Sequence, residues 1–394
     1  MILLLAGTAG LWYYFPANTP ATVNRDSLQK MYPLKASKLK DTYRPEIIRK
    51  KDVQVRPRNP ELVEYYDNRF AASKRTANSL SLDRQSNLNS LDERGFRKGV
   101  FSKKNIPDLG MVTIIMGNDL FTLTDYYYTS GVGLEVIHPV FSFLPTRHLL
   151  FPFSSKSIDY YGFSVIQDLY TPYDLEDAEI QYGDRPFAAY LCIGFSKTSL
   201  FREQALRLKT QVYFGVIGPA ALGNFSQDIF HSLEPSGWVN QVSNDVVVNY
   251  NLDFSKGIVN DNNFELLTVA SGRIGTLFTD VSLGVIMRFG NELSAFKYYT
   301  PLEYKGNKFR YDFFLNLAGR AKGYDATLQG GLFNRTSVYV IPESNIERFL
   351  LIPSAGVNLS YGIVQLRLEQ LYSSPEFTGA KHHFFGKISL GFSF

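Results

Sequence analysis

The sequence has 394 residues, of which 45% are hydrophobic and 20% are charged, and its mean hydropathy is −0.12. No window reaches the roughly 18 consecutive apolar residues of a membrane-spanning helix, which excludes a helical membrane protein. A single cysteine, Cys192, excludes a disulfide scaffold and a cysteine-based zinc site. The 31 Phe, 25 Tyr and 30 Gly favour strand-rich structure, and an all-β barrel can use this length as one domain.

The first 19 residues form an apolar segment that ends in small residues, as export signals do. A signal peptide usually opens with Lys or Arg, whereas the first basic residue here is Arg25. We interpret residues 1–19 as an export-signal-like segment, and the alternative is a buried N-terminal helix.

Residues 20–108 are basic and polar, with 20 Lys and Arg against 11 Asp and Glu, so the rest of the chain is slightly acidic. Too few apolar residues recur here to offset chain entropy, which predicts a mostly flexible periplasmic extension with local helix. The charges are interspersed, without an aromatic-glycine RNA signature or zinc-finger spacing, so no nucleic-acid partner is expected.

Residues 109–394 have one sequence pattern throughout, in which apolar residues alternate with polar or small ones. About twelve such segments of roughly 10 to 16 residues follow one another, each long enough for a tilted membrane-crossing strand of ~9–11 residues. The pattern predicts an all-β fold, an antiparallel twelve-stranded transmembrane β-barrel. Closure of such a barrel satisfies every backbone group in lipid and leaves no free edge.

The last segment has the clearest alternation. The residues Phe384, Gly386, Ile388, Leu390, Phe392 and Phe394 fall on one face, and Phe385, Lys387, Ser389, Gly391 and Ser393 fall on the other. The chain stops on an aromatic residue, as bacterial outer-membrane barrels do. The alternative is the last strand of a soluble β-protein.

Strand parity indicates where a site would lie. If the chain enters from the periplasm, the connections after the first, third and fifth strands face outward. The first follows Asn118 and Asp119, the second spans Thr171 to Pro186, and the third spans 218–241. In the third we expect a short helix that carries Gln227 and His231 four residues apart, hence on one face.

These residue types suit ester hydrolysis. His231 is a candidate general base because imidazole titrates near neutral pH. Asn118, Asp119, Thr129 and backbone carbonyls offer the oxygen ligands that a hard cation prefers. A lone loop histidine is nevertheless more often structural. The sequence has no glycine-rich phosphate cradle and no G-x-S-x-G elbow, which argues against nucleotide-dependent and ordinary serine-hydrolase chemistry.

Seven motifs occur in order between residues 117 and 241, namely GNDLF, DYYYTSGVGL, QDLYTP, GDRPFAAYL, FGVIGPAALG, QDIFH and GW-x-x-Q. Together they resemble the lipid A 3-O-deacylase family of outer-membrane enzymes. The resemblance implies a barrel that removes the 3′-linked acyloxyacyl group of lipid A in a calcium-dependent reaction. It also implies a site between the barrel wall and a loop helix, facing outward.

The resemblance assigns roles to individual residues. His231 matches the general base that activates water, and Gln227 matches the amide one turn before it. Asn118 and Asp119 match the pair at the end of the first strand that is associated with the cation and the active centre. Thr129 matches the hydroxyl residue that opens the second strand. We therefore predict these five as catalytic, with Asn118 and Asp119 as metal ligands.

Three further residues are predicted at the substrate. Asp184 and Arg185 match an Asp-Arg pair of the family, for which an architectural role is the alternative, because an Arg–carboxylate pair can fix a loop. Trp238 is expected to anchor its loop at the membrane interface, where Trp is favoured. The second outer loop is acidic where some members carry Lys and Arg, so the resemblance does not extend to recognition of lipid A phosphates.

The leading interpretation is an esterase of the bacterial outer membrane. It is expected to act as a monomer, with lipid A of lipopolysaccharide and outer-membrane lipid as its partners. Its expected mechanism has His231 deprotonate water while calcium polarises the ester carbonyl. Two alternatives remain open, a non-enzymatic barrel that acts as a pore or adhesin, and a soluble periplasmic β-protein.

Overall fold

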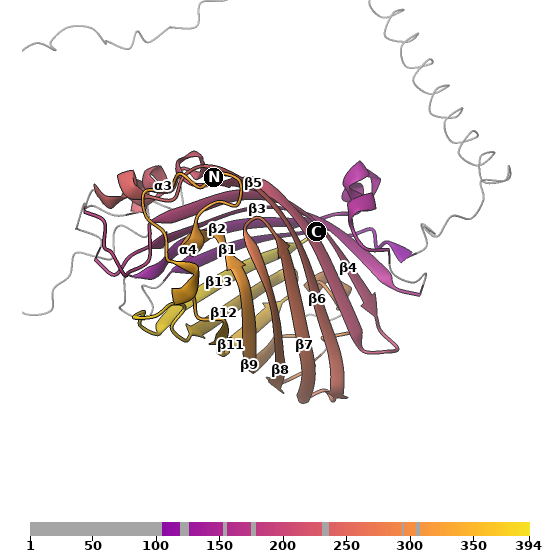
Figure 1. The fold of residues 1–394 in the computed structure, drawn as a ribbon. Coiled ribbons are helices and arrows are strands. Elements are labelled where there is room, and N and C mark those ends of the chain that lie inside the picture. Colours follow the sequence, from indigo (N-terminus) through magenta and orange to yellow (C-terminus); the bar gives the residue numbers. More distant parts are fainter. Residues whose placement is uncertain are drawn as a thin grey trace, which may run out of the picture. The chain divides into compact units, whose positions relative to one another are not determined.

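A computed structural model describes most of the chain from residue 105 onward (Figure 1). The described residues are 105–118, 126–152, 156–174, 179–230, 236–293, 295–304 and 308–394. The predicted export segment and nearly all of the predicted basic extension lie outside this range.

The described residues form one antiparallel sheet (Figure 1). Its strands are β1 (Met111–Asn118), β2 (Tyr127–Ile137), β3 (Ile158–Thr171), β4 (Ala188–Phe201), β5 (Leu206–Ile217), β6 (Asp245–Asn260), β7 (Phe264–Gly275), β8 (Phe278–Gly290), β9 (Arg310–Asp325), β10 (Phe349–Leu351), β11 (Ser354–Tyr361), β12 (Val364–Ser373) and β13 (His383–Ser393). The helices are α3 (Gly223–Phe230) and α4 (Ala326–Gln329), with short 3-10 turns η4 (Pro139–Phe143), η5 (Pro145–Leu149), η6 (Pro219–Ala221), η7 (Ser236–Asn240), η8 (Pro301–Glu303) and η9 (Glu343–Asn345).

The sheet closes on itself because β1 pairs with β13 and β8 pairs with β9. The short β10 and the longer β11 both pair with β9 and occupy one position around the barrel. Pro353 lies between them and has no N–H to donate to the ladder, which explains the break. The barrel therefore has twelve strand positions, and the predicted antiparallel twelve-stranded fold is confirmed.

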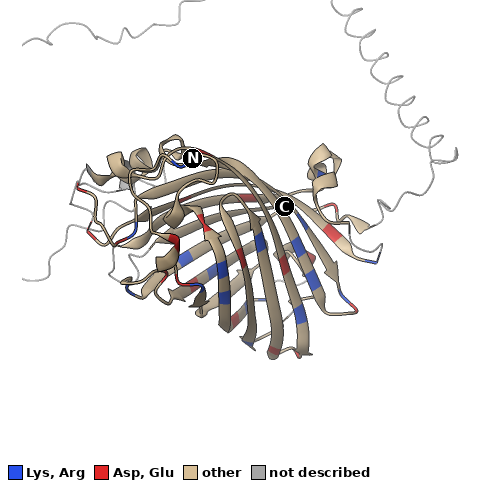
Figure 2. Cartoon of the chain, viewed as in Figure 1, with Lys and Arg blue, Asp and Glu red and all other residues tan. Residues whose placement is uncertain are grey.

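The predicted alternation places one set of side chains inside the barrel. Lys209 on β5 bonds Glu135 on β2 at 2.8 Å, and because these strands are not neighbours the contact crosses the interior. The strand register also places two pairs of opposite charge on this lumen face. Arg273 lies opposite Asp280, and Lys387 lies opposite Glu369. Figure 2 shows basic and acidic positions distributed along neighbouring strands.

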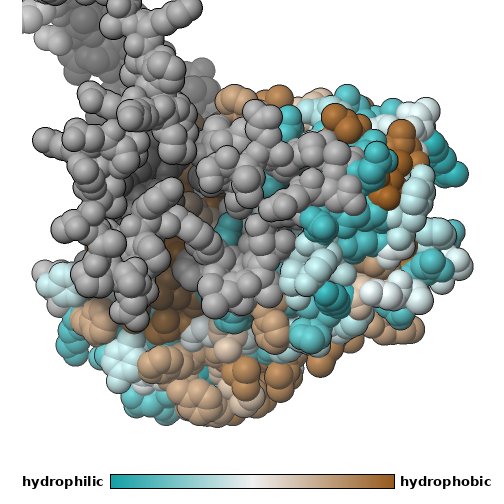
Figure 3. Space-filling model, turned by 90° about the vertical axis from the view of Figure 1, so that its left-hand side faces the viewer, coloured by the Kyte–Doolittle hydropathy of each residue, from teal (hydrophilic) through white to brown (hydrophobic). Residues whose placement is uncertain are grey.

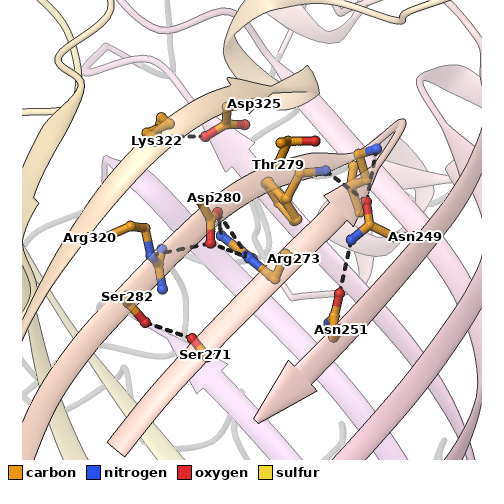
Figure 4. A network of polar contacts seen from close by, with 12 residues as sticks. Asn249, Asn251, Ser271, Arg273, Thr279, Asp280, Ser282, Arg320, Lys322 and Asp325 are labelled. Carbon is orange, nitrogen blue, oxygen red and sulfur yellow. Dashed lines mark hydrogen bonds and ion pairs between the residues drawn. The ribbon is translucent and has the colours of Figure 1, made fainter. Parts of the chain in front are cut away.

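Paired polar groups fill part of this lumen (Figure 4). The Arg273 Nε donates to both carboxylate oxygens of Asp280 at 3.0 Å, and Ser271 shares a hydrogen bond of 2.6 Å with Ser282. Asn249 donates to Asn251 at 2.9 Å, and its Oδ1 accepts from the backbone N–H of Phe278. These bonds tie β6, β7 and β8 together across the inner face of the wall.

Long connections cover the two ends of the lumen. At the end where β1 begins and β13 stops, here called the terminus end, Glu303 of the β8–β9 connection accepts from Tyr160 on β3 at 2.7 Å. Phe296 of the same connection packs with Leu200 and Leu267. At the opposite end, Leu328 and Ile341 of the β9–β10 connection pack with Phe377. The described residues thus occlude the barrel, which disfavours an open pore.

The other set of side chains faces outward and is apolar. Ile274, Leu283 and Phe313 are each at least 60% exposed. Such exposed apolar side chains are typical of a barrel wall that faces lipid and unfavourable on a wall that faces water. In Figure 3 apolar residues gather along the lower margin of the visible face. No helix within the described ranges has the length and apolar character needed to cross a membrane.

Candidate functional site

The predicted site residues that the structure describes lie at the end of the barrel where β1, β3 and β5 stop, here called the α3 end after the helix labelled in Figure 1. Asn118 is the last residue of β1 and lies opposite Ser130 of β2. Its Nδ2 donates to the carbonyl of Thr129 at 3.0 Å. Gly117 and Lys387 face each other in the lumen register, so strand alternation directs Asn118 to the outer face.

Thr129 sits at a bulge of β2, where the register with β3 shifts between Tyr128 and Ser130. A bulge re-aims side chains locally, and here the Thr129 hydroxyl meets that of Thr171 at 2.5 Å. Both threonines are fully buried. The structure therefore brings Asn118 and Thr129 together and adds Thr171 to them.

The predicted loop helix is confirmed as α3, and it packs on the outside of the barrel wall. Gln167, an outward residue of β3, donates to the Ala221 carbonyl at 2.6 Å and accepts from Ser226 of α3 at 2.9 Å. Gly223 approaches the wall so closely that a Cβ there would lie 2.6 Å from the Ala189 Cβ. Leu222 and Phe225 remain exposed, so α3 presents apolar surface beside the wall.

Gln227 and Trp238 form the inner support of this loop. The indole Nε1 of Trp238 donates to Gln227 Oε1 at 2.5 Å, and both side chains are nearly fully buried. Trp238 also packs with Leu169 and Phe187. Trp238 thus anchors the loop through burial against the wall rather than through an exposed position.

The two halves of the site lie on adjoining parts of the outer wall. Asn118 is opposite Ser130, and Ser130 is opposite Leu169, which belongs to the Trp238 cluster. Two strand spacings separate Asn118 from Leu169, about 10 Å. Neutral polar groups therefore surround a short strip of wall between β1 and α3.

Asp184 and Arg185 have structural contacts at the mouth of the lumen. Asp184 accepts from the backbone N–H of Tyr173 at 2.8 Å. The Arg185 guanidinium pairs with Glu376, donates to Thr327 at 2.6 Å and lies over a lumen tyrosine ring. These contacts favour the architectural role for Asp184 and Arg185, while their predicted contact with substrate stays a prediction.

Glu376 joins two cations at this end. Besides Arg185 it binds Lys322 at 3.0 Å, and Lys322 also binds Asp325 at 2.7 Å. Burial by itself would raise the pKa of Glu376, but the charges of Lys322 and Arg185 outweigh it and hold that pKa well below its usual value. The network therefore keeps Glu376 ionised and fastens β9, its α4 turn and two connections to each other.

Two predicted residues, Asp119 and His231, lie outside the described residues. Within the described ranges no group of three or more His, Cys, Asp or Glu side chains could hold a metal ion. The donor chemistry beside Asn118 nevertheless fits calcium, because the amide, the two threonine hydroxyls and the Thr129 carbonyl all supply oxygen. The roles predicted for Asp119 and His231 stay predictions.

Three contributors were not predicted as site residues. Gln167 and Thr171 both belong to the QDLYTP motif, whose outward positions could have indicated them. Glu376 lies about 190 residues from Arg185 in sequence, and only the closure of the barrel brings the two together. The seven motifs between residues 117 and 241 do not include Glu376.

The fold and this site define a class of protein, an outer-membrane β-barrel that carries polar groups on its outer wall. The family model described as outer membrane protein LpxR matches residues 99–394, and the chain belongs to this family. The family resemblance predicted from the seven motifs is thereby confirmed, and the localisation in the outer membrane is consistent with the fold. No curated protein matches the sequence.

Among solved structures, LpxR from Salmonella typhimurium is similar, with a TM-score of 0.58, 21% identity, and coverage of 72% of this chain and 99% of that one. At this identity the likeness shows the fold alone. The beta domain of the Bordetella autotransporter BrkA has 9% identity, a TM-score of 0.37, and coverage of 73% and 97%.

Proposed function

We propose that this protein is a lipid A 3-O-deacylase, an esterase that removes the 3′-linked acyloxyacyl group of lipid A at the outer face of the membrane. Family membership supports the substrate class. The observation that carries the proposal is the position of Asn118, Gln167 and Gln227 on or against the outer wall, since a lipid substrate reaches that surface and not the occluded lumen.

The wall and α3 provide a fitting environment for an amphiphile. Leu222, Phe225 and Val239 expose apolar surface around the polar strip, which suits acyl chains. The ester would lie between this surface and the polar groups of β1 and β2.

The reaction is the addition of water to the ester carbonyl. His231 in its neutral form accepts a proton from the attacking water, a C–O bond forms to the acyl carbon, and the bond to the sugar oxygen breaks. His231 then returns the proton to the leaving sugar oxygen, which balances the step. Gln227, held by Trp238, fixes the helix that precedes His231.

Asn118 and Asp119 would hold the calcium ion, with Thr129 beside them. When bound, the ion supplies positive charge for the developing oxyanion. The chain itself contributes the orientation of this ligand group, because the bond from Asn118 to the Thr129 carbonyl fixes the amide at the end of β1.

The decisive experiment is mass spectrometry of purified lipid A incubated with the full protein, with calcium or with chelator. We expect loss of the mass of one acyloxyacyl group only in the presence of calcium. Unchanged lipid A under both conditions, from a protein with the heat-modifiable migration of a folded barrel, would contradict the proposal. The alternative of a non-enzymatic pore would instead appear as ion conductance in planar bilayers.

A further inference from the structure

A polar cavity lies inside the barrel at the terminus end, away from the outer wall. Its volume is about 220 Å³, and it is bounded by the lumen wall and by the β8–β9 connection. Its lining includes four arginines from four strands, Arg207, Arg288, Arg310 and Arg367. Such a convergence of guanidinium groups requires a source of negative charge.

Two of the four arginines are already neutralised by the protein. Arg288 bonds Glu265 at 2.6 Å and Asp312 at 2.8 Å. Arg367 bonds Glu369 at 3.0 Å and lies 4.0 Å from the centre of a phenylalanine ring. These pairs account for the polar lumen wall beside the cavity and do not need a ligand.

The other two arginines have no such partner. Neither Arg207 nor Arg310 forms an ion pair with any residue in the described ranges, and Arg310 only stacks on Tyr304 at 4.3 Å. Two carboxylates line the cavity, but Arg288 and Asn358 bind Asp312, and Lys308 binds Glu292. Asp253 on β6 acts on Arg207, and Glu292 and Asp312 act on Arg310, but none of these carboxylates comes within ion-pair distance of the two guanidinium groups. Arg207 and Arg310 therefore keep guanidinium donors at the cavity that an entering anion can bind.

We propose that this cavity binds a small phosphate-bearing anion through Arg207 and Arg310. Phosphate oxygens match the rigid fork of guanidinium donors. Tyr298, Ser360 and Gln365 add neutral hydrogen-bonding groups to the lining. The volume is below the ~300 Å³ at which pockets for drug-sized ligands begin, so inorganic phosphate or a short phosphate ester fits and a lipid A headgroup does not. The proposal is independent of the deacylase activity.

The first test is titration calorimetry of the full-length protein in detergent with inorganic phosphate and with glycerol phosphate. We expect Arg207→Gln and Arg310→Gln each to weaken phosphate binding at least tenfold. Arg335→Gln, a change in an exposed loop at the α3 end, is the matched control and should bind as the unmodified protein does. Phosphate binding that both cavity variants retain would overturn the proposal.

A second test needs no variant and so does not depend on variant folding. Phenylglyoxal labels accessible arginines, and peptide mass spectrometry reports each site. Phosphate should slow the labelling of Arg207 and Arg310 and leave Arg335 unchanged. Equal labelling of Arg207 and Arg310 with and without phosphate would contradict phosphate binding in the cavity. Protection by nanodiscs of anionic lipid but not by phosphate would replace the small anion with a lipid headgroup and would equally overturn the proposal.

Discussion

The outer wall at the α3 end and the lumen behind it use polar residues in opposite ways. On the outer wall the described polar groups of the site are neutral. Asn118 and Gln167 donate to backbone carbonyls and Gln227 accepts from the Trp238 indole, beside exposed apolar residues. In the lumen the polar groups are charged, and ion pairs such as Lys209–Glu135 join strands across the interior.

The difference follows from the medium on each side. A charged side chain on a lipid-facing wall is costly, whereas neutral hydrogen-bonding groups are tolerated if they are satisfied. The closed lumen holds charges mainly as ion pairs between strands, and Arg207 and Arg310 at the cavity are exceptions. The comparison predicts that changes on the outer wall alter activity and leave stability nearly intact, and that changes in the lumen network do the reverse.

The largest effect on activity is expected from His231→Ala. Loss of a general base lowers the rate by roughly 10²–10⁴-fold, while the barrel stays folded because strand pairing stabilises it. Deacylation followed by mass spectrometry measures the rate, and heat-modifiable migration reports folding. His148→Ala, at the terminus end, is the control. The unmodified enzyme should gain activity as pH rises through the imidazole titration. A folded His231→Ala protein with near-normal activity would disprove the mechanism.

The largest effect on stability is expected from Glu376→Gln, which removes the anion shared by Arg185 and Lys322. An unpaired buried charge costs about 3–5 kcal/mol of unfolding free energy. Urea unfolding in detergent measures it. Glu343→Gln removes an exposed pair with Arg348 and should cost less than about 1 kcal/mol. Equal losses in the two variants would mean that the Glu376 network is not stabilising.

The same network predicts a dependence of stability on pH. Because the pKa of Glu376 is lower in the folded protein than in the unfolded chain, its contribution is complete above the unfolded value, about 4.3. The contribution declines as pH falls from there and is lost as pH falls through the lower folded-state pKa. Unfolding free energies between pH 3 and pH 7 should therefore decline toward acid in the unmodified protein. The decline should be shallower in Glu376→Gln, and parallel curves would assign it to other carboxylates.

Asp119→Asn should lower activity less than loss of the base. The substitution removes a charged ligand of a hard cation and keeps its shape, so millimolar calcium should restore part of the rate. A calcium titration of the deacylation rate measures this, with Asp261→Asn in the β6–β7 turn as the control. A loss that no calcium concentration relieves would argue against a role for Asp119 in metal binding.

The smallest expected effect concerns Gln167→Ala, which removes both hydrogen bonds between β3 and the α3 loop. Each of these part-buried hydrogen bonds contributes about 0.5–1.5 kcal/mol to holding the loop. Proteolysis of the α3 loop should quicken and activity should fall, while global unfolding changes little. Ser226→Ala removes only one of these bonds and should have the milder effect. Equal protease sensitivity of all three proteins would show that Gln167 does not hold the loop.

Much of the barrel was predictable from the sequence. Alternation in a strand such as β13 places Lys387 on one face and Ile388 on the other, whatever the rest of the fold does, because successive side chains point to opposite sides. About twelve such alternating segments predict the twelve strand positions of the barrel. Asn118, Thr129 and Gln227 were found through local motifs, and α3 through its spacing.

Only the tertiary structure decided which distant residues meet. Closure of the sheet brings Glu376 to Arg185 and Lys322, and the return of a connection brings Glu303 to Tyr160. The bulge at Thr129 and the contact of Gln167 with α3 also depend on packing. Local sequence determines the face on which a residue lies, since that follows from backbone geometry. The partner of a residue across the barrel depends on register and closure, which no single segment encodes.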